Sequence, residues 1–386
     1  DHTNFVMMFW PALSVAAKLD RLKNAEAKLL ALAREFGERN GYEYKIVTMD
    51  TAIPRHVVPL KDNDEEKKQL ILHAIRVDSK TAQGRREEIP LVLLHGYMNA
   101  AAYFYRNLVG LTHYFGTVYS LDLLGWGLSS RPNFSLNDNG DEVSAAEDFF
   151  VESLEAWRKR NNIPKMILAG HSMGGYLSVK YSEVYPQYVE RLLLLSPVGV
   201  PEESDGIRER RAAMKQNSWR VWALSGFAQN VFEFSSGGGI LRRMPASWGE
   251  TIFLNYVQKR MPMISDPAEQ QAISEYLVAN NTLPGSGEHC INKVLTPHAF
   301  AKRPLEYRIP HLKVPKVTFL YGDHDWMDPK GGLVVQRKCE AEPKSAPEVE
   351  VYTITKAGHL LMLENWREFN AAVILGAGGS VEDLPA

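Results

Sequence analysis

Residues 165–186 read KMILAGHSMGGYLSVKYSEVYP, and this stretch joins two elements of different kinds. Its first five residues are Lys165 followed by four apolar residues, a pattern typical of a strand buried inside a parallel sheet. The part from Ser172 to Tyr185 predicts a helix that ends before Pro186, because a proline disfavours helical backbone in the residue before it. The stretch therefore indicates a buried strand that passes directly into a helix.

The turn between this strand and this helix matches the pattern G-x-S-x-G, from Gly170 to Gly174. The pattern alone is weak evidence, and an ordinary glycine-rich turn is the alternative. Its position directly after a buried strand and before a helix is what a nucleophile elbow requires, where a strained turn projects the serine above the sheet. We therefore interpret Ser172 as a candidate nucleophile, and Gly170, His171 and Gly174 as the elbow around it.

Apolar runs and helical segments alternate along most of the chain. Further strands are predicted at residues 45–49, 71–77, 90–95, 118–124, 191–196, 317–321 and 349–355. Ser144-Ala-Ala-Glu147 is typical of a capping box and predicts a helix that runs from there to about Asn161. Another helix is predicted from Glu364 to Leu375. This alternation predicts the α/β class, with a mostly parallel central sheet and helices on both faces.

The alternation stops between Pro197 and about Pro310, which predicts a helical cap over the carboxyl ends of the strands. The chain is therefore predicted to begin with an amphipathic helical extension at residues 1–40. The core follows in two parts, at residues 41–197 and 311–386, with the cap between them at residues 198–310. Residues 13–39 have helical periodicity and are interpreted as a helix packed on the core. In the alternative interpretation, Phe5–Trp10 adds a shallow interfacial anchor in front of it.

The composition argues against several classes of protein. The chain has 386 residues, with 44 Lys and Arg against 46 Asp and Glu, and this balance gives no global basic field for nucleic acid. The longest apolar stretch has nine residues, whereas a membrane-spanning helix needs about 20. The two cysteines, Cys290 and Cys339, predict neither a disulfide framework nor a CxxC metal site, which favours a reducing intracellular compartment.

A serine hydroxyl is a poor nucleophile at neutral pH and needs a base, which an acid orients. His359 follows the last predicted strand and is the candidate base. The loop after the preceding strand offers three carboxylates. Asp325 has the spacing G-x-x-D-x-x-x-P that is usual for the acid, Asp328 is the alternative, and Asp323 is expected to hold the loop.

The negative oxygen of a tetrahedral intermediate needs hydrogen-bond donors aimed at it. One candidate is the backbone N–H of Met173, directly after the nucleophile. The other is the N–H of Tyr97, because Gly96 before it allows the backbone to approach the substrate. This chemistry implies neither a metal nor an organic cofactor.

Five motifs in this order resemble the α/β-hydrolase family over about residues 65–375. They are His95-Gly96, the segment 122–132, the elbow, the loop with Asp325, and His359. Gly170–Gly175, Leu195–Pro201, Arg303-Pro-Leu and the segment 321–328 resemble its lipid-acting branch. That branch includes a fungal cardiolipin-specific deacylase, an N-acyl-phospholipid lysophospholipase and a lipid-droplet lipase coactivator.

This resemblance implies activity on lipids and a mitochondrial or other membrane-surface location. The coactivator has Asn at the nucleophile position, whereas this chain keeps Ser172, which favours a working hydrolase. The branch is also associated with an H-x4-D motif proposed for acyl transfer to lysophosphatidate. In this chain Glu364 stands five residues after His359, so the motif is altered.

The composition of the predicted cap bears on the kind of substrate. Residues 206–264 hold nine Lys and Arg against three acidic residues, and aromatic residues are interleaved with them. Such a surface suits an enzyme that works on an anionic membrane, with Arg242, Arg243, Trp219 and Trp222 as the candidate contacts. The alternative is an ordinary cap whose aromatic residues fill the pocket roof.

These observations predict a serine acyl hydrolase that acts on a glycerophospholipid, either cardiolipin or an N-acyl phospholipid. An esterase or aminopeptidase for small soluble substrates is the first alternative, since the core motifs serve those reactions too. A lipid-binding scaffold or complex subunit with a vestigial triad is the second alternative. A transacylase is the third, and it differs only in whether a lysolipid replaces water as acyl acceptor.

Overall fold

The computed structural model describes residues 13–61, 69–81, 86–203, 239, 241–296, 299–342 and 344–384. Within these residues, an eight-stranded sheet has the order β1-β2-β4-β3-β5-β6-β7-β8. The strands are β1 Tyr44–Pro54, β2 Gln69–Ser79, β3 Leu91–Leu94, β4 Thr117–Leu121, β5 Met166–His171, β6 Val189–Leu195, β7 Lys316–Gly322 and β8 Glu348–Ile354. The pairs β1–β2 and β2–β4 are antiparallel and the other pairs are parallel, so the predicted mostly parallel α/β architecture is confirmed.

The register of the parallel strands brings the candidate motifs to one edge of the sheet. Leu94 at the end of β3 lies opposite both Leu121 of β4 and Gly170 of β5. The last residues of β6 and β7 continue the same edge. Because the chain leaves each of these strands at this edge, the loops that follow them converge there.

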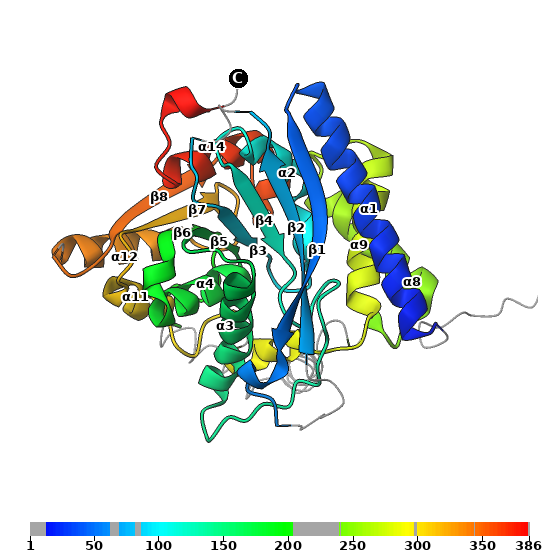
Figure 1. The fold of residues 1–386 in the computed structure, drawn as a ribbon, viewed down its shortest axis with the longest axis horizontal. Helices are drawn as coiled ribbons and strands as arrows, with labels where there is room; N and C mark the ends of the chain where they lie inside the picture. The colour runs from blue at the N-terminus through cyan, green and yellow to red at the C-terminus, as the bar shows by residue number, and fades with distance from the viewer. Residues whose placement is uncertain are drawn as a thin grey trace, which may run out of the picture.

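Helices cover both faces of the sheet (Figure 1). They are α1 Val15–Arg39, α2 Tyr105–Leu111, α3 Glu142–Arg160, α4 Met173–Val184, α8 Ala246–Arg260, α9 Pro267–Thr282, α10 Ile291–Val294, α11 Leu305–Arg308, α12 Lys330–Ala341, α13 Leu361–Glu364 and α14 Trp366–Gly376. One core includes side chains of α3, α4 and α12, and the other includes side chains of α1, α2, α8, α9 and α14. Every residue of β3 and β5 is buried, as expected for strands covered on both faces.

The N-terminal helix α1 lies where the periodicity predicts a helix, and it packs against α9 and α2. Its buried face is centred on Leu22 and Leu29, whereas Val15 is 52% exposed. Two ion pairs of 2.7 and 2.6 Å join α1 to the cap helices, Arg21 with Glu250 of α8 and Lys28 with Glu275 of α9. Helix α1 therefore contacts both the core and the cap. Phe5–Trp10 lies outside the described residues.

Helix α3 begins earlier than the capping-box pattern predicts. Its N-cap is Asp141, whose carboxylate accepts from the backbone N–H of Ser144. Glu147, which the pattern assigns to the capping box, instead accepts from the hydroxyl of Tyr176 on α4. The prediction was wrong because an acidic side chain three residues before Ser144 supplies the cap, and Arg303 pairs with that same carboxylate.

Between β6 and β7, the described residues form helices and loops and contain no strand, and we refer to the helices of this segment as the cap helices. Trp219 and Trp222 lie outside the described residues. Among the helices that the structure describes, none combines the length and the apolar character that crossing a bilayer requires.

Candidate active site

The turn at Ser172 has the strained geometry that the sequence predicts for an elbow. Ser172 has φ 53° and ψ −114°, a conformation that L-residues rarely adopt. A Cβ on Gly170 would lie 2.3 Å from the carbonyl oxygen of Gly174, and one on Gly174 would lie 2.6 Å from that of Leu94. Both glycines are therefore required by close backbone approach. The result is a serine held between the end of β5 and the first turn of α4.

The structure brings Ser172, His359 and Asp325 together from three separate loops. Ser172 Oγ lies 3.1 Å from Nε2 of His359, and Nδ1 of His359 lies 3.2 Å from Oδ1 of Asp325. The three residues follow β5, β8 and β7, respectively. This order of contacts is the arrangement in which an imidazole can take a proton from a serine while a carboxylate orients it.

The Asp325 carboxylate is fully shielded from solvent and yet stabilised as an anion. Burial raises its pKa, but hydrogen bonds with His359 and Ser196, the charge on His359 and the Met327 N–H together lower the pKa below its ordinary value. The group therefore stays ionised at neutral pH, as an orienting acid must.

The other two acids of this loop do not contact His359. Asp328 is exposed, and its Oδ1 accepts the backbone N–H of Lys330 at the start of α12. This placement argues against Asp328 as the alternative acid. Asp323 accepts the N–H groups of Lys356 and Ala357, so it holds the loop before His359 as expected.

Ser196 is a member of this group that the sequence analysis missed. It follows β6 with φ 47°, and its hydroxyl donates to Oδ2 of Asp325. The same Oγ lies 2.7 Å from Nδ1 of His359. Ser196 therefore touches both the acid and the base. A serine before a proline at the end of a strand carries no distinctive sequence signal, and only the parallel register of β6 and β7 reveals its place.

Two further side chains fix the backbone of the histidine loop. The ring of His171 lies 2.8 Å, through Nε2, from the carbonyl oxygen of His359, and burial and the nearby His359 lower the pKa of His171 to about 3. His171 is therefore neutral and donates this bond through Nε2–H. Glu364 accepts the backbone N–H of Gly358, and burial raises its pKa. Glu364, at the altered H-x4-D position, thus contacts the backbone beside the base.

The loop that follows β3 approaches the nucleophile closely. A Cβ on Gly96 would lie only 3.1 Å from Cβ of Ser172, which places the backbone before Tyr97 against the serine. Met173 is the first residue of α4, where N–H groups have no acceptor within the helix. Both predicted oxyanion donors therefore belong to segments that border Ser172.

The cap helix α9 holds this same loop in place. Asn281 donates to the carbonyl oxygen of Met98 at 2.8 Å, and Asn280 donates to that of Asn99 at 3.1 Å. Both asparagines are buried. They hold the loop that carries Tyr97, the predicted oxyanion donor, and a pair of asparagines late in a predicted cap gives no sequence signal for that contact.

The predicted lipid-surface arginines differ in environment. The Arg242 guanidinium pairs with the buried carboxylate of Glu288 and donates to the carbonyl oxygen of Leu283 at 3.0 Å. Arg242 therefore packs inside the cap segment and does not face a lipid surface as predicted. Arg243 is exposed.

The comparisons with known proteins agree with this geometry. A family model described as the alpha/beta hydrolase fold matches residues 89–365. A 1-acylglycerol-3-phosphate O-acyltransferase from Arabidopsis thaliana is 29% identical over 77% of this chain and 68% of its own length. A (lyso)-N-acylphosphatidylethanolamine lipase from Mus musculus is 32% identical over 75% of this chain and 79% of its own. A naproxen esterase from Bacillus subtilis matches with a TM-score of 0.54 at 16% identity, over 94% of this chain and 98% of that one, which shows the fold alone.

Proposed function

The chain belongs to the α/β-hydrolase family, and we propose that it is a serine hydrolase that removes a fatty acyl chain from a glycerophospholipid. The observation that carries the proposal is the contact of Ser172 with His359 and of His359 with Asp325, at 3.1 and 3.2 Å. An intact set of nucleophile, base and acid supports catalysis over a purely lipid-binding role.

The reaction would proceed through an acyl-enzyme. Ser172 Oγ attacks the ester carbonyl while Nε2 of His359 takes its proton, and Asp325 stabilises the resulting imidazolium. The N–H groups of Tyr97 and Met173 would hold the negative oxygen. His359 then protonates the departing alcohol oxygen of the lysolipid, and a water molecule, deprotonated by the same imidazole, releases the fatty acid and restores Ser172.

The class of substrate is proposed from the names of similar proteins and from the resemblance in sequence. Proteins named as a 1-acylglycerol-3-phosphate O-acyltransferase and as a (lyso)-N-acylphosphatidylethanolamine lipase are similar to this chain over about three quarters of its length. Both names describe transfer or removal of an acyl chain on a phospholipid. N-acylphosphatidylethanolamine is a substrate to examine because the mouse relative's name gives it, and cardiolipin is another because the sequence resembles the cardiolipin-specific deacylase.

A direct test presents the purified full chain with vesicles that contain either cardiolipin or N-acylphosphatidylethanolamine, and with a short soluble p-nitrophenyl ester. We expect released fatty acid from at least one vesicle substrate, with a higher kcat/KM than for the soluble ester. Good turnover of the ester and none of the vesicles would instead support the small-substrate esterase.

Acyl transfer is the second candidate, because the name of the plant relative describes it. It differs in the last step, where the hydroxyl of a lysolipid replaces water. Adding lysophosphatidate to the vesicle assay distinguishes the two, because hydrolysis yields free fatty acid whereas transfer yields phosphatidate in its place.

We further propose that α8 and the residues beside it contact an anionic membrane. Trp248 and Ile252, one helical turn apart on α8, are 58% and 48% exposed, and Met263 just beyond the helix is 51% exposed. Exposed cations flank them, namely Arg243, Lys259 and Arg260. Apolar side chains beside cations suit an interface with anionic lipid. A mitochondrial or other membrane-surface location stays a prediction.

Charge reversal at Arg243 tests this surface. Arg243→Glu replaces an attraction of about 1 kcal/mol by a similar repulsion, so partitioning onto cardiolipin-containing vesicles should fall about 30-fold. The change should be small on vesicles of phosphatidylcholine alone. Sedimentation with the vesicles measures both. Lys313→Glu, at an exposed cation whose neighbours Leu312 and Val314 belong to the core cluster that α8 does not join, is the matched control. Equal losses in the two variants would contradict a specific surface at α8.

A further inference from the structure

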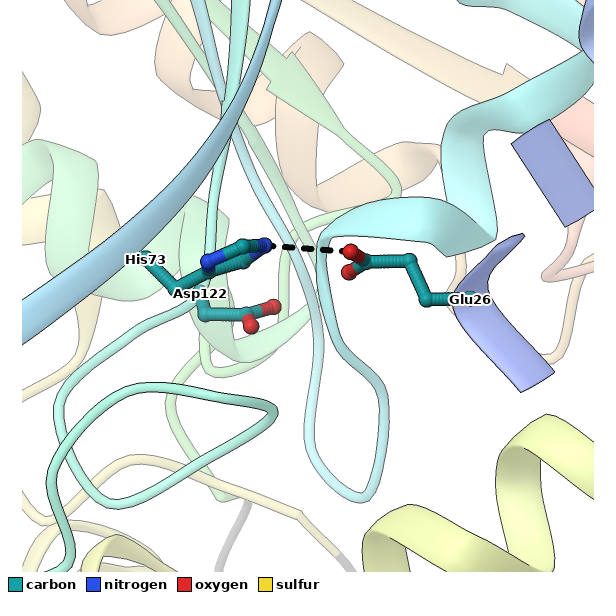
Figure 2. Close-up of side chains that lie close together, drawn as sticks. All are labelled: Glu26, His73 and Asp122. Atoms are coloured by element: carbon teal, nitrogen blue, oxygen red, sulfur yellow. Dashed lines mark hydrogen bonds and ion pairs between the residues drawn. The ribbon is translucent and has the colours of Figure 1, made fainter. Parts of the chain in front are cut away.

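A buried cluster of ionisable side chains lies outside the candidate active site. Glu26 of α1, His73 of β2 and Asp122 after β4 are 4%, 5% and 0% exposed. One ligand atom from each lies within 4.8 Å of the others. Figure 2 shows the Glu26 carboxylate pointing at the His73 imidazole, with the Asp122 carboxylate beside it. We propose that Glu26, His73 and Asp122 bind one divalent transition-metal ion of the zinc class, which joins α1 to the sheet.

The types of donor atom, and the spacing between Glu26 and His73, suit such an ion. Oε1 of Glu26 lies 3.1 Å from Nε2 of His73. Two ligands at about 2.0–2.1 Å from a tetrahedral zinc ion lie about 3.3 Å apart, so this pair already has the spacing of two ligands on one ion. Imidazole with carboxylates is a donor set that zinc accepts.

One carboxylate oxygen of the cluster has no hydrogen-bond partner. Oε2 of Glu26 is buried and unpartnered. A buried carboxylate oxygen without a donor or a cation is costly. Asp122, in contrast, accepts the backbone N–H groups of Ala101 at 2.6 Å and Leu128 at 2.7 Å. Glu26 Oε2 is therefore the oxygen of this cluster that lacks a partner. A cation between Glu26, His73 and Asp122 would supply that partner.

The histidine is already oriented as metal-binding histidines are. Nδ1 of His73 lies 2.7 Å from Oδ1 of Asp50 on β1. In metal sites, a carboxylate that accepts from one ring nitrogen fixes the tautomer and directs the other nitrogen at the ion. Asp50 is thus a positioning residue that leaves Nε2 of His73 to face Glu26.

An ion can reach the cluster from outside. A cavity of about 790 Å³ lies between α1, β1, β2 and the segment after β4, and Glu26, Asp50 and His73 line it. A proposed metal site requires such an entry path as well as ligands and an outer shell. The competing occupant is a proton on Nε2 of His73, because the surrounding carboxylates favour the imidazolium as they would favour a metal ion.

Zinc uptake by the full-length protein tests the site. After treatment with a chelator, the wild type should take up one zinc ion per chain in equilibrium dialysis, measured by elemental analysis. Glu26→Gln and His73→Gln should lose this uptake, and Asp50→Asn should weaken it about 10- to 100-fold. His56→Gln, a change at an exposed histidine, is the matched control and should retain it. Absence of uptake by the folded wild type, or full uptake by folded His73→Gln, would overturn the proposal.

A second measurement needs no variant, because changes at buried positions can prevent folding. Wild type with ¹⁵N-labelled histidine is titrated with zinc, and the imidazole nitrogens are followed by NMR. We expect one buried imidazole to change from protonated on both nitrogens to metal-bound through Nε2. An imidazolium that persists at saturating zinc would show that a proton occupies the site, and would overturn the proposal. Neither readout depends on acyl hydrolysis. A failure of the proposed metal site can therefore be distinguished from a failure of the proposed hydrolase function.

Discussion

Ser172→Ala is expected to abolish covalent labelling by a fluorophosphonate and to lower kcat for acyl hydrolysis by about 10⁶-fold. Removing the nucleophile of a serine hydrolase lowers kcat by about this factor, because the base and the acid then have no hydroxyl to activate. Lipid profiling of cells that carry the variant should show the uncleaved substrate accumulating. The measurement compares gel fluorescence of the labelled proteins with the rate of fatty-acid release.

The variant should fold normally. Alanine keeps the Cβ of serine, so it adds no strain at φ 53°, and Ser172 Oγ has a hydrogen-bond partner only in His359 among the described contacts. An unchanged thermal unfolding midpoint is the control. Persistent labelling of folded Ser172→Ala would assign the reactive serine elsewhere. Absence of labelling in the folded wild type would favour the hypothesis of a lipid-binding scaffold.

Asp325→Asn is expected to lower kcat by about 10⁴-fold, with little change in KM. An amide at this position can donate to Nδ1 of His359, which would favour the tautomer that carries its proton on Nε2 and cannot accept from Ser172. It would also remove the negative charge that stabilises the imidazolium. Steady-state kinetics on whichever substrate the vesicle assay identifies measures the effect.

The same loop offers a matched control. Asp328→Asn makes an identical chemical change three residues away, at an exposed carboxylate that accepts the backbone N–H of Lys330, the first residue of α12. It should leave kcat close to that of the wild type. A large loss in Asp328→Asn together with a small loss in Asp325→Asn would reverse the assignment of the acid.

The fold and the contact of Ser172 and Asp325 with His359 could be predicted because their signals are local. Each motif stands at the end of an apolar strand, and parallel strands end at a common edge, so Ser172, Asp325 and His359 could be expected to meet. The same logic missed Ser196, since its type and its neighbours resemble those of many loop serines. Its importance comes from contacts with residues 129 and 163 positions away, and such contacts leave no local pattern.

Where a single side chain had two available partners, the sequence did not decide between them. Glu147 has the spacing of a capping-box acid but accepts from Tyr176, because α4 lies directly across from it. Arg242 stands in a basic segment but turns inward to Glu288, whose buried carboxylate needs a cation. The cluster of Glu26, His73 and Asp122 gave no signal either, since its members are separated by 47 and 49 positions and meet only through tertiary packing.

The antiparallel strands β1 and β2 determine where the chain can be shortened without exposing the edge of the sheet. The family match begins at residue 89, after β1 and β2. A fragment cut to that match would leave β4 with an open row of backbone donors and acceptors where β2 now pairs. Exposed edges of this kind promote side-by-side association between molecules. The part of the chain that matches the family is therefore smaller than the part that keeps this sheet edge paired, and we expect a fragment that begins at residue 89 to aggregate more readily than the full chain.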